Sequence, residues 1–226
     1  MHPTVAASFN FSVSKAHKAQ LRLAQQIVTE DHLPRKITRV AGVDISYTDE
    51  FAIGAVAVLD FASLEILEQQ TATVKVRFPY ISTLLSFREI PPAVACIRKL
   101  RLQPDVLLAD GQGLAHPYRC GFASHLGLAV EKPTIGVAKR RLVGEPTVIA
   151  SNVFLVQKGR IIGAVVTTRK SAKPVYVSVG HLVSLETAVK IVKHCARNSK
   201  IPEPIRQAHK IAAEERKRVQ AKHKPL

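Results

Sequence analysis

The chain has 226 residues, of which 46% are hydrophobic, so it suits one α/β domain with a full core and excludes a disordered or fibrous chain. Lysine and arginine outnumber aspartate and glutamate by 33 to 17, and the formal net charge of +16 favours a polyanionic partner, most commonly nucleic acid, although ribosomal and membrane-surface proteins are basic too. Three widely spaced cysteines without a C-x-x-C pair argue against a zinc site or a disulfide framework, and the lack of an apolar leader or of a run near about 18 apolar residues argues for a cytoplasmic protein outside the membrane.

The first half of the chain predicts one helix, three strands and a second helix. Apolar residues at helical spacing indicate an amphipathic helix over 14–30. Three runs rich in valine and isoleucine follow, separated by short turns that favour antiparallel pairing. They occupy 39–47, 52–60 and 64–76. After a loop, the next helix is expected over 89–102, because Pro91 and Pro92 are tolerated only in a first turn.

In the second half, helices and strands alternate. Short apolar or β-branched runs predict strands at 106–109, 134–138, 152–157, 161–167 and 175–179. Helices are expected at 118–130, at 184–197 after the N-cap Ser184, and from 205 onward. Three antiparallel strands followed by this alternation predict an α/β fold, a mixed sheet flanked by helices as in RNase H-like domains. Fold analogy alone says little about function.

We expect a single domain over 1–226 with a basic tail that loses regular structure from about residue 216. Lysines and arginines crowd this end of the chain, at Arg216, Lys217, Arg218, Lys222 and Lys224. Such a tail favours salt-dependent binding to phosphates. A solvated helix end with a disordered tip is an equally good interpretation.

Three acidic residues are candidates for holding a divalent cation, whose preferred ligands are carboxylate oxygens. Period-2 geometry places Asp44 on one strand face with Gly42 and Ser46, although it could simply face solvent. Asp110 ends an apolar strand, at the edge where sites form in α/β sheets, although it could merely cap a turn. Glu89 begins a helix, where a carboxylate is also favoured by the helix dipole alone.

Around these acids the sequence resembles the endonuclease V family over about residues 15 to 215. The matching segments are 42–44, 79–81, 84–89, 110–113 with His116-Pro117, 121–127, 133–139, 180–181 and 202–204. An ordered set of this length is far more specific than one short motif. The resemblance implies the RNase H-like fold and a nuclease that requires Mg²⁺, with Mn²⁺ as a substitute.

The resemblance also implies roles for individual residues. Asp44 and Asp110 resemble the main metal ligands, and Glu89 a further carboxylate of the same site. His209 resembles a fourth active-site residue that positions a second metal or a water, and Lys139 a lysine near the scissile phosphate. Lys139 could also be an ordinary surface lysine.

DNA contacts are implied for two segments. Tyr80, between Pro79 and Ile81, resembles the aromatic wedge that fills the gap left by an extruded base. His116 resembles a further DNA contact, with helix capping or loop ordering as the alternative. The expected base pocket is lined by Leu85, Gly111 and Gly113. At the wedge the family usually has Pro-Gly where this chain has Ser82-Thr83, which puts strict selection of deoxyinosine, and of DNA over RNA, in question.

The expected activity is hydrolysis of DNA containing deoxyinosine on the 3′ side of the lesion, at the second phosphodiester bond, leaving 3′-hydroxyl and 5′-phosphate ends. Single-stranded DNA and inosine-containing RNA are further candidate substrates. The alternatives are an inosine-specific endoribonuclease and a non-catalytic binder of deaminated nucleic acid. We expect a monomer without membrane partners.

Overall fold

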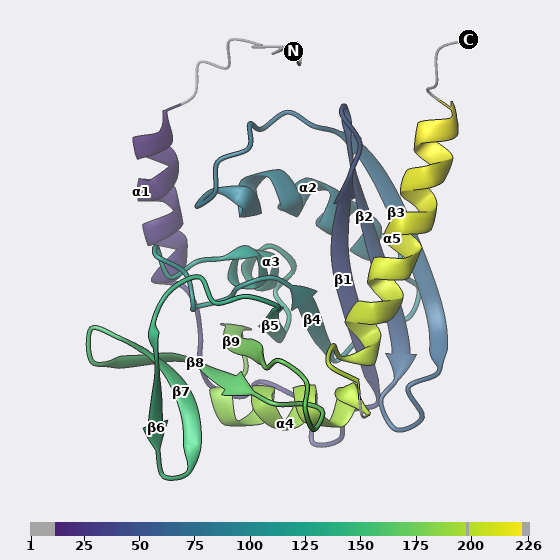
Figure 1. Cartoon of the computed structure of the whole chain (residues 1–226). Coiled ribbons are helices and arrows are strands. Elements are labelled where there is room, and N and C mark those ends of the chain that lie inside the picture. The colour runs from purple at the N-terminus through teal and green to yellow at the C-terminus, as the bar shows by residue number, and fades with distance from the viewer. Residues whose placement is uncertain (1–11, 198, 223–226) are drawn as a thin grey trace.

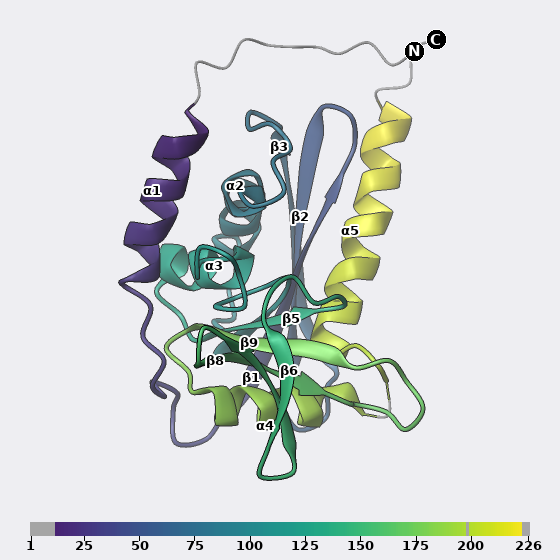
Figure 2. The same cartoon turned by 60° about the vertical axis from the view of Figure 1, so that its left-hand side comes forward.

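The described residues, 12–197 and 199–222 of a computed structural model, form one mixed β-sheet with helices packed on both faces (Figures 1 and 2). The sheet has nine strands in the order β3-β2-β1-β4-β5-β9-β8-β7-β6. Their bounds are β1 Arg39–Tyr47, β2 Phe51–Asp60, β3 Ile66–Lys75, β4 Val106–Asp110, β5 Thr134–Ala138, β6 Glu145–Ile149, β7 Asn152–Gln157, β8 Arg160–Val166 and β9 Val175–His181.

Strand direction changes at the centre of the sheet. Strands β1, β2 and β3 pair antiparallel, as the three Val- and Ile-rich runs predict, and β1 then pairs parallel with β4, and β4 with β5. The remaining strands, from β9 outward, are antiparallel. Parallel strands need crossover connections, and helices supply them here. Three antiparallel strands, followed by parallel strands joined through helices, are the predicted RNase H-like architecture.

The described residues form five helices, four of which cover the sheet. Their bounds are α1 Val13–Ala24, α2 Leu85–Ile97, α3 Phe122–Val130, α4 Leu185–Ala196 and α5 Glu203–Lys222. One hydrophobic cluster joins α4 and α5 to one face of the sheet, and a second joins α2 and α3 to the other. Helix α1 lies outside α3, away from the sheet (Figure 1).

Side chains of β1 alternate between these two clusters. Val43 packs in the cluster beneath α2, whereas Val40, three residues earlier and of opposite parity, packs beneath α5. Asp44 therefore faces α5, as the period-2 pattern predicts. Gly42 is required on the same face, because a Cβ there would overlap the backbone carbonyl of Pro204 in the first turn of α5.

Several boundaries differ from the prediction. Helix α1 ends at Ala24 rather than near residue 30. Helix α2 begins at Leu85, so Pro91 and Pro92 lie in its second turn rather than its first, where they remove two backbone hydrogen bonds. Burial of this stretch of α2 against the sheet offsets that loss. Strand β6 was not predicted, because all five of its residues are exposed and show no burial pattern.

The C-terminal segment decides between the two interpretations of the basic tail. Regular structure is not lost from about residue 216, and the helix-end alternative is the one observed, because α5 continues to Lys222. Val219 explains the extension, because it is 7% exposed and gives this part of the helix an apolar contact. Residues 1–11, in which we expected no apolar leader, and residues 223–226, the end of the predicted tail, lie outside the described residues. None of the described helices is long and apolar enough to cross a membrane.

Candidate functional site

The candidate site lies where β4 and β5 end beside the middle of β1, on the face covered by α5. Val106 and Leu108 of β4 pack toward α5, and the alternation places Asp110 on the same face. Val43 pairs with Ala109 in the parallel register, so Asp44, inside β1, and Asp110, the last residue of β4, occupy neighbouring positions. Lys139 directly follows β5 and completes the row.

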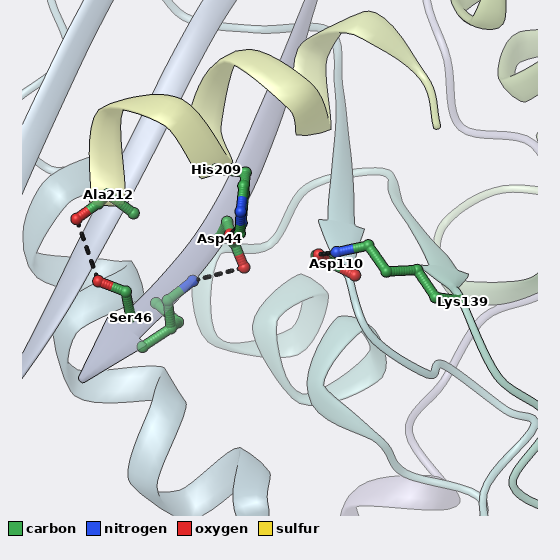
Figure 3. Close-up of polar contacts among 7 residues, drawn as sticks. Asp44, Ser46, Asp110, Lys139, His209 and Ala212 are labelled. Carbon is green, nitrogen blue, oxygen red and sulfur yellow. Dashed lines mark hydrogen bonds and ion pairs between the residues drawn. The ribbon is translucent and has the colours of Figure 1, made fainter. Parts of the chain in front are cut away.

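Helix α5 adds an imidazole to these strand ends. The Nδ1 atom of His209 lies 2.7 Å from Oδ2 of Asp44, whose Oδ1 accepts the backbone N–H of Ile45 at 2.9 Å (Figure 3). One potential ligand atom from each of Asp44, Asp110 and His209 lies within 4.8 Å of the others. Across the site, the Nζ atom of Lys139 donates to Oδ2 of Asp110 at 2.5 Å. The predicted residues Asp44, Asp110, Lys139 and His209 are thus brought together.

Nearby backbone contacts hold α5 against β1. Ser46, two residues after Asp44 on the same strand face, donates its hydroxyl to the carbonyl of Ala212 at 3.0 Å (Figure 3). Because Gly42 admits Pro204 at one end and Ser46 binds Ala212 further along, His209 is fixed between two anchored points.

Glu89 reaches the site from the opposite face of the sheet. It is the fifth residue of α2, whereas the sequence predicted that it begins the helix. The Asp44–Asp110–His209 group does not include it. Its carboxylate is nevertheless close enough to both aspartates for their charges to act on it. A role as metal ligand for Glu89 stays a prediction.

Asp44, Glu89 and Asp110 lie close enough together for their negative charges to repel one another. Burial, and then the charges of Asp44 and Asp110, raise the pKa of Glu89 to about 8. Burial and the charge of Asp110 also raise the pKa of Asp44, against the opposing hydrogen bond from His209. Carboxylates that repel one another in a partly buried site gain from a cation between them. Two or three carboxylates and an imidazole form a donor set that suits a hard divalent ion.

The predicted wedge lies on the loop between β3 and α2, residues 76–84, which we call the Tyr80 loop. Tyr80 is 72% exposed, whereas its neighbours Pro79 and Ile81 are half-buried. The loop closes in a turn in which the N–H of Leu84 donates to the carbonyl of Ile81 at 2.8 Å. Ser82 and Thr83 occupy the two central positions of this turn.

The predicted pocket residues divide into two groups. Leu85 and Gly111 are half-buried, at the start of α2 and just after β4. Gly113 is buried instead, since a Cβ there would overlap the Val179 carbonyl, and its N–H already donates to Ser178 at 2.8 Å. Its amide therefore has an internal partner, and close packing accounts for this glycine. The pocket stays a prediction for Leu85 and Gly111.

His116 lies on the segment between β4 and α3, residues 111–121, which we call the His116 loop. It is 5% exposed, and burial lowers its pKa to about 4, followed by the effect of the nearby His17. Its Nδ1 atom accepts the backbone N–H of Tyr118 at 3.2 Å. This geometry favours the loop-ordering alternative over a direct DNA contact.

Two neighbours of the site were missed from the sequence. The guanidinium of Arg88 stacks over the Tyr47 ring, 4.4 Å from its centroid, and also donates to the Phe78 carbonyl at 3.4 Å. Tyr47 shares the strand parity of Val43, which faces α2, so the alternation along β1 could have suggested the pair. Arg88 adjoins Glu89 and partly opposes the rise in its pKa.

Comparison with known proteins bears directly on this arrangement. The Endonuclease V family model matches residues 21–210, which include each of the clustered residues. The chain belongs to the endonuclease V family. Among its relatives, the endonuclease V of Thermofilum pendens is 45% identical over 205 residues, which is 90% of this chain and 88% of that protein. That of Rippkaea orientalis is 43% identical over 89% of this chain and 90% of its own length.

Solved endonuclease V structures have the same fold. The Streptomyces avermitilis enzyme superimposes with a TM-score of 0.86 at 35% identity, covering 95% of this chain and 97% of that one. The Ciona intestinalis enzyme, solved with a 24mer DNA containing an inosine followed by a ribo-adenosine, gives 0.82 at 32% identity, covering 92% and 98%. Membership of this family makes the chain a nuclease, and so a hydrolase.

Proposed function

We propose that this endonuclease V family member is a DNA-repair enzyme that recognises deoxyinosine and hydrolyses a phosphodiester bond on its 3′ side. The second bond is the expected position, with 3′-hydroxyl and 5′-phosphate products. The observation that carries the proposal is the convergence of Asp44, Asp110, His209 and Lys139 from three neighbouring strands and helix α5. The inosine-containing DNA bound by the Ciona intestinalis relative supports the choice of lesion.

Asp44 and Asp110 would hold Mg²⁺, with Mn²⁺ as a substitute, and Glu89 and His209 would complete the site from the two flanking helices. Such an ion, when bound, supplies a nucleophilic water at neutral pH and neutralises charge on the phosphate. His209 orients the Asp44 carboxylate through their 2.7 Å contact. Lys139, which pairs with Asp110 and is 45% exposed, can place its ammonium beside the scissile phosphate.

Lesion recognition is assigned to the Tyr80 loop and the start of α2. The exposed ring of Tyr80, flanked by Pro79 and Ile81, would fill the space left by an extruded base and so offset unstacking, which costs a few kcal/mol. Leu85 and Gly111 would line the pocket for hypoxanthine, which lacks the exocyclic amine of guanine. The basic end of α5 would add sequence-independent binding to DNA phosphates. The enzyme would act as a monomer in the cytoplasm.

The test is cleavage of an end-labelled duplex containing one deoxyinosine, with Mg²⁺, with Mn²⁺ and with chelator, beside an undamaged duplex. A single metal-dependent nick 3′ of the lesion is expected. Equal cutting of both duplexes would remove lesion recognition from the proposal but keep the nuclease.

An inosine-specific ribonuclease is the second candidate, because the Ciona intestinalis relative binds a strand in which a ribonucleotide follows the inosine. Matched DNA and RNA strands separate the two, since that choice depends on contacts to the 2′-hydroxyl. If the protein binds both strands but cuts neither, it is a non-catalytic binder of deaminated nucleic acid.

A further inference from the structure

Helix α1 contacts both loops that the proposed function places at the lesion. The Nε2 atom of His17 lies 2.9 Å from the Thr83 hydroxyl in the Tyr80 loop, and its ring stacks on Tyr118 of the His116 loop at 3.9 Å between centroids. One turn later, the side-chain amide of Gln20 donates to the carbonyls of Thr83 at 3.1 Å and Cys120 at 2.6 Å. Two side chains on one helix face thus join the two loops.

The contacts of Gln20 lie in the interior of the protein. Gln20 is 0% exposed, although glutamine is mostly a surface residue. The side-chain amide of Gln20 therefore exchanges hydrogen bonds to water for hydrogen bonds to two backbone carbonyls. Losing either of these bonds leaves a buried polar group unsatisfied. Ala16, on the same helix face, is also buried. This face of α1 is consequently fixed relative to both loops.

The turn held by α1 has little stiffness of its own. Proline restricts the backbone at the second position of a turn, and glycine frees the third to adopt positive φ. Here those positions are Ser82 and Thr83, and Thr83 is not among the described residues with positive φ. Neither residue restricts the turn as proline would, so contacts with neighbouring elements restrict it, and at Thr83 these contacts come from α1.

We propose that His17 and Gln20 of α1 are positioning residues that hold the Ser82-Thr83 turn and thereby fix Tyr80 relative to the His116 loop. This inference rests on the proposed function for its effect on lesion recognition. Its structural part, the restraint on Tyr80, can be measured without any cleavage. Tyr80 lies only three residues from Thr83, and on its other side the loop is held by Phe78, which stacks on Phe87 and accepts a hydrogen bond from Arg88.

The sequence offers a direct probe, because it contains no tryptophan. Tyr80→Trp places one fluorophore on the loop, and its anisotropy decay reports local motion. His17→Phe keeps an aromatic ring to stack on Tyr118 but removes the bond to Thr83, and Thr83→Val removes the same bond from the other side. Ser14→Ala, an exposed position on the same helix, is the matched control.

Each of the two variants should add a fast, large-amplitude component to the anisotropy decay of the Tyr80→Trp protein, and Ser14→Ala should not. Ser82→Pro should restore the slow decay in the His17→Phe background, because proline restricts the turn locally. An anisotropy decay unaltered by both His17→Phe and Thr83→Val would overturn the inference, whether or not the protein prefers inosine.

Cleavage provides the second readout, with tyrosine kept at position 80. His17→Phe should lower kcat/KM for the deoxyinosine duplex about fivefold, through KM, in keeping with the loss of one hydrogen bond, and Ser82→Pro should recover it. A loosened loop with unchanged cleavage would refute the role in lesion recognition. A parent enzyme without inosine preference would instead refute the proposed function, leaving the fluorescence comparison to decide the restraint.

Discussion

The imidazole of His209 lies 2.7 Å from the carboxylate of Asp44, although 165 residues separate them in the chain. The contact joins the last described helix to the first strand of the sheet. It also opposes the burial and the charge of Asp110 that raise the pKa of Asp44. The contact between His209 and Asp44 thus stabilises the site, whereas repulsion between Asp44 and Asp110 destabilises it in the absence of a cation.

Asp44→Asn should abolish cleavage but not destabilise the metal-free protein. Removing a ligand carboxylate withdraws several kcal/mol of charge stabilisation, so we expect a loss of at least about a thousandfold in kcat. The melting temperature in chelator should not fall, because a buried negative charge beside Asp110 is removed. Asp49→Asn, at an exposed turn, is the control for both measurements. Substantial cleavage by Asp44→Asn would contradict its assigned role.

Divalent cations should stabilise the wild-type fold. An ion bound only by the native protein adds about 1.4 kcal/mol at ten times its Kd, or roughly 3–5 °C in Tm for a chain of this size. Calorimetry with Mg²⁺ or Mn²⁺ against chelator measures the shift. It should vanish in an Asp44→Asn/Asp110→Asn double variant, and a shift of the same size in that variant would place the ion elsewhere.

Lys139→Met should slow cleavage without removing metal-dependent stabilisation. The ammonium contacts Asp110 but is 45% exposed, so it contributes little to folding and remains available to a phosphate. We expect kcat to fall by about ten- to a hundredfold, with the cation-induced Tm shift retained. Lys36→Met removes the same charge before β1, away from the site, and should cleave normally. Loss of the Tm shift in Lys139→Met would instead make the lysine part of the metal site.

Gly42→Ala should inactivate the enzyme through helix α5 rather than through chemistry. The added methyl group overlaps the Pro204 carbonyl, so the start of α5 must move and His209 with it. We expect a loss of about 2–4 kcal/mol in unfolding free energy and a large loss of activity. Gly159→Ala is the comparison, since open space surrounds that glycine and only its positive φ of 72° adds strain. Equal stability of the two variants would contradict the tight contact.

His125 should make the protein sensitive to acid. Burial lowers its pKa to about 4 from the ordinary 6.5, and its Nδ1 atom pairs with the Ser86 hydroxyl at 3.1 Å. Because the unfolded chain binds the proton first, the stability that His125 contributes is full above pH 6.5 and is lost as the pH falls toward 4. The full difference between the two pKa values corresponds to roughly 3 kcal/mol of unfolding free energy. Urea unfolding of wild type and His125→Gln at pH 7 and pH 5 isolates it, since the difference in stability between them should shrink at pH 5.

The sequence predicted the parts of the fold that local pattern controls. Strands 39–47, 134–138 and 152–157 agree with β1, β5 and β7, and Ser184 caps α4 with its hydroxyl accepting the Thr187 N–H. Strand β6 had no burial pattern to find, and the extension of α5 depends on a tertiary contact of Val219. Local signals cannot report either feature.

The same distinction applies to the site. The alternation in β1 placed Asp44 on the correct face, but its meeting with His209 came from family resemblance rather than from spacing. Gly113 stays a predicted pocket residue, but its close packing alone accounts for a glycine there, and the sequence does not distinguish that need from a ligand contact. His17 and Gln20 gave no signal, since their partners lie 63 or more residues away.

The position of His209 on α5 has a consequence for how the nuclease arises during synthesis. All nine strands precede that helix in the chain, so a polypeptide emerging from the ribosome can complete the sheet while the site still lacks its imidazole. Docking of α5 over Gly42 then finishes the core and the site in one event. A chain released before that point would have the strands of the site but not the contact between His209 and Asp44.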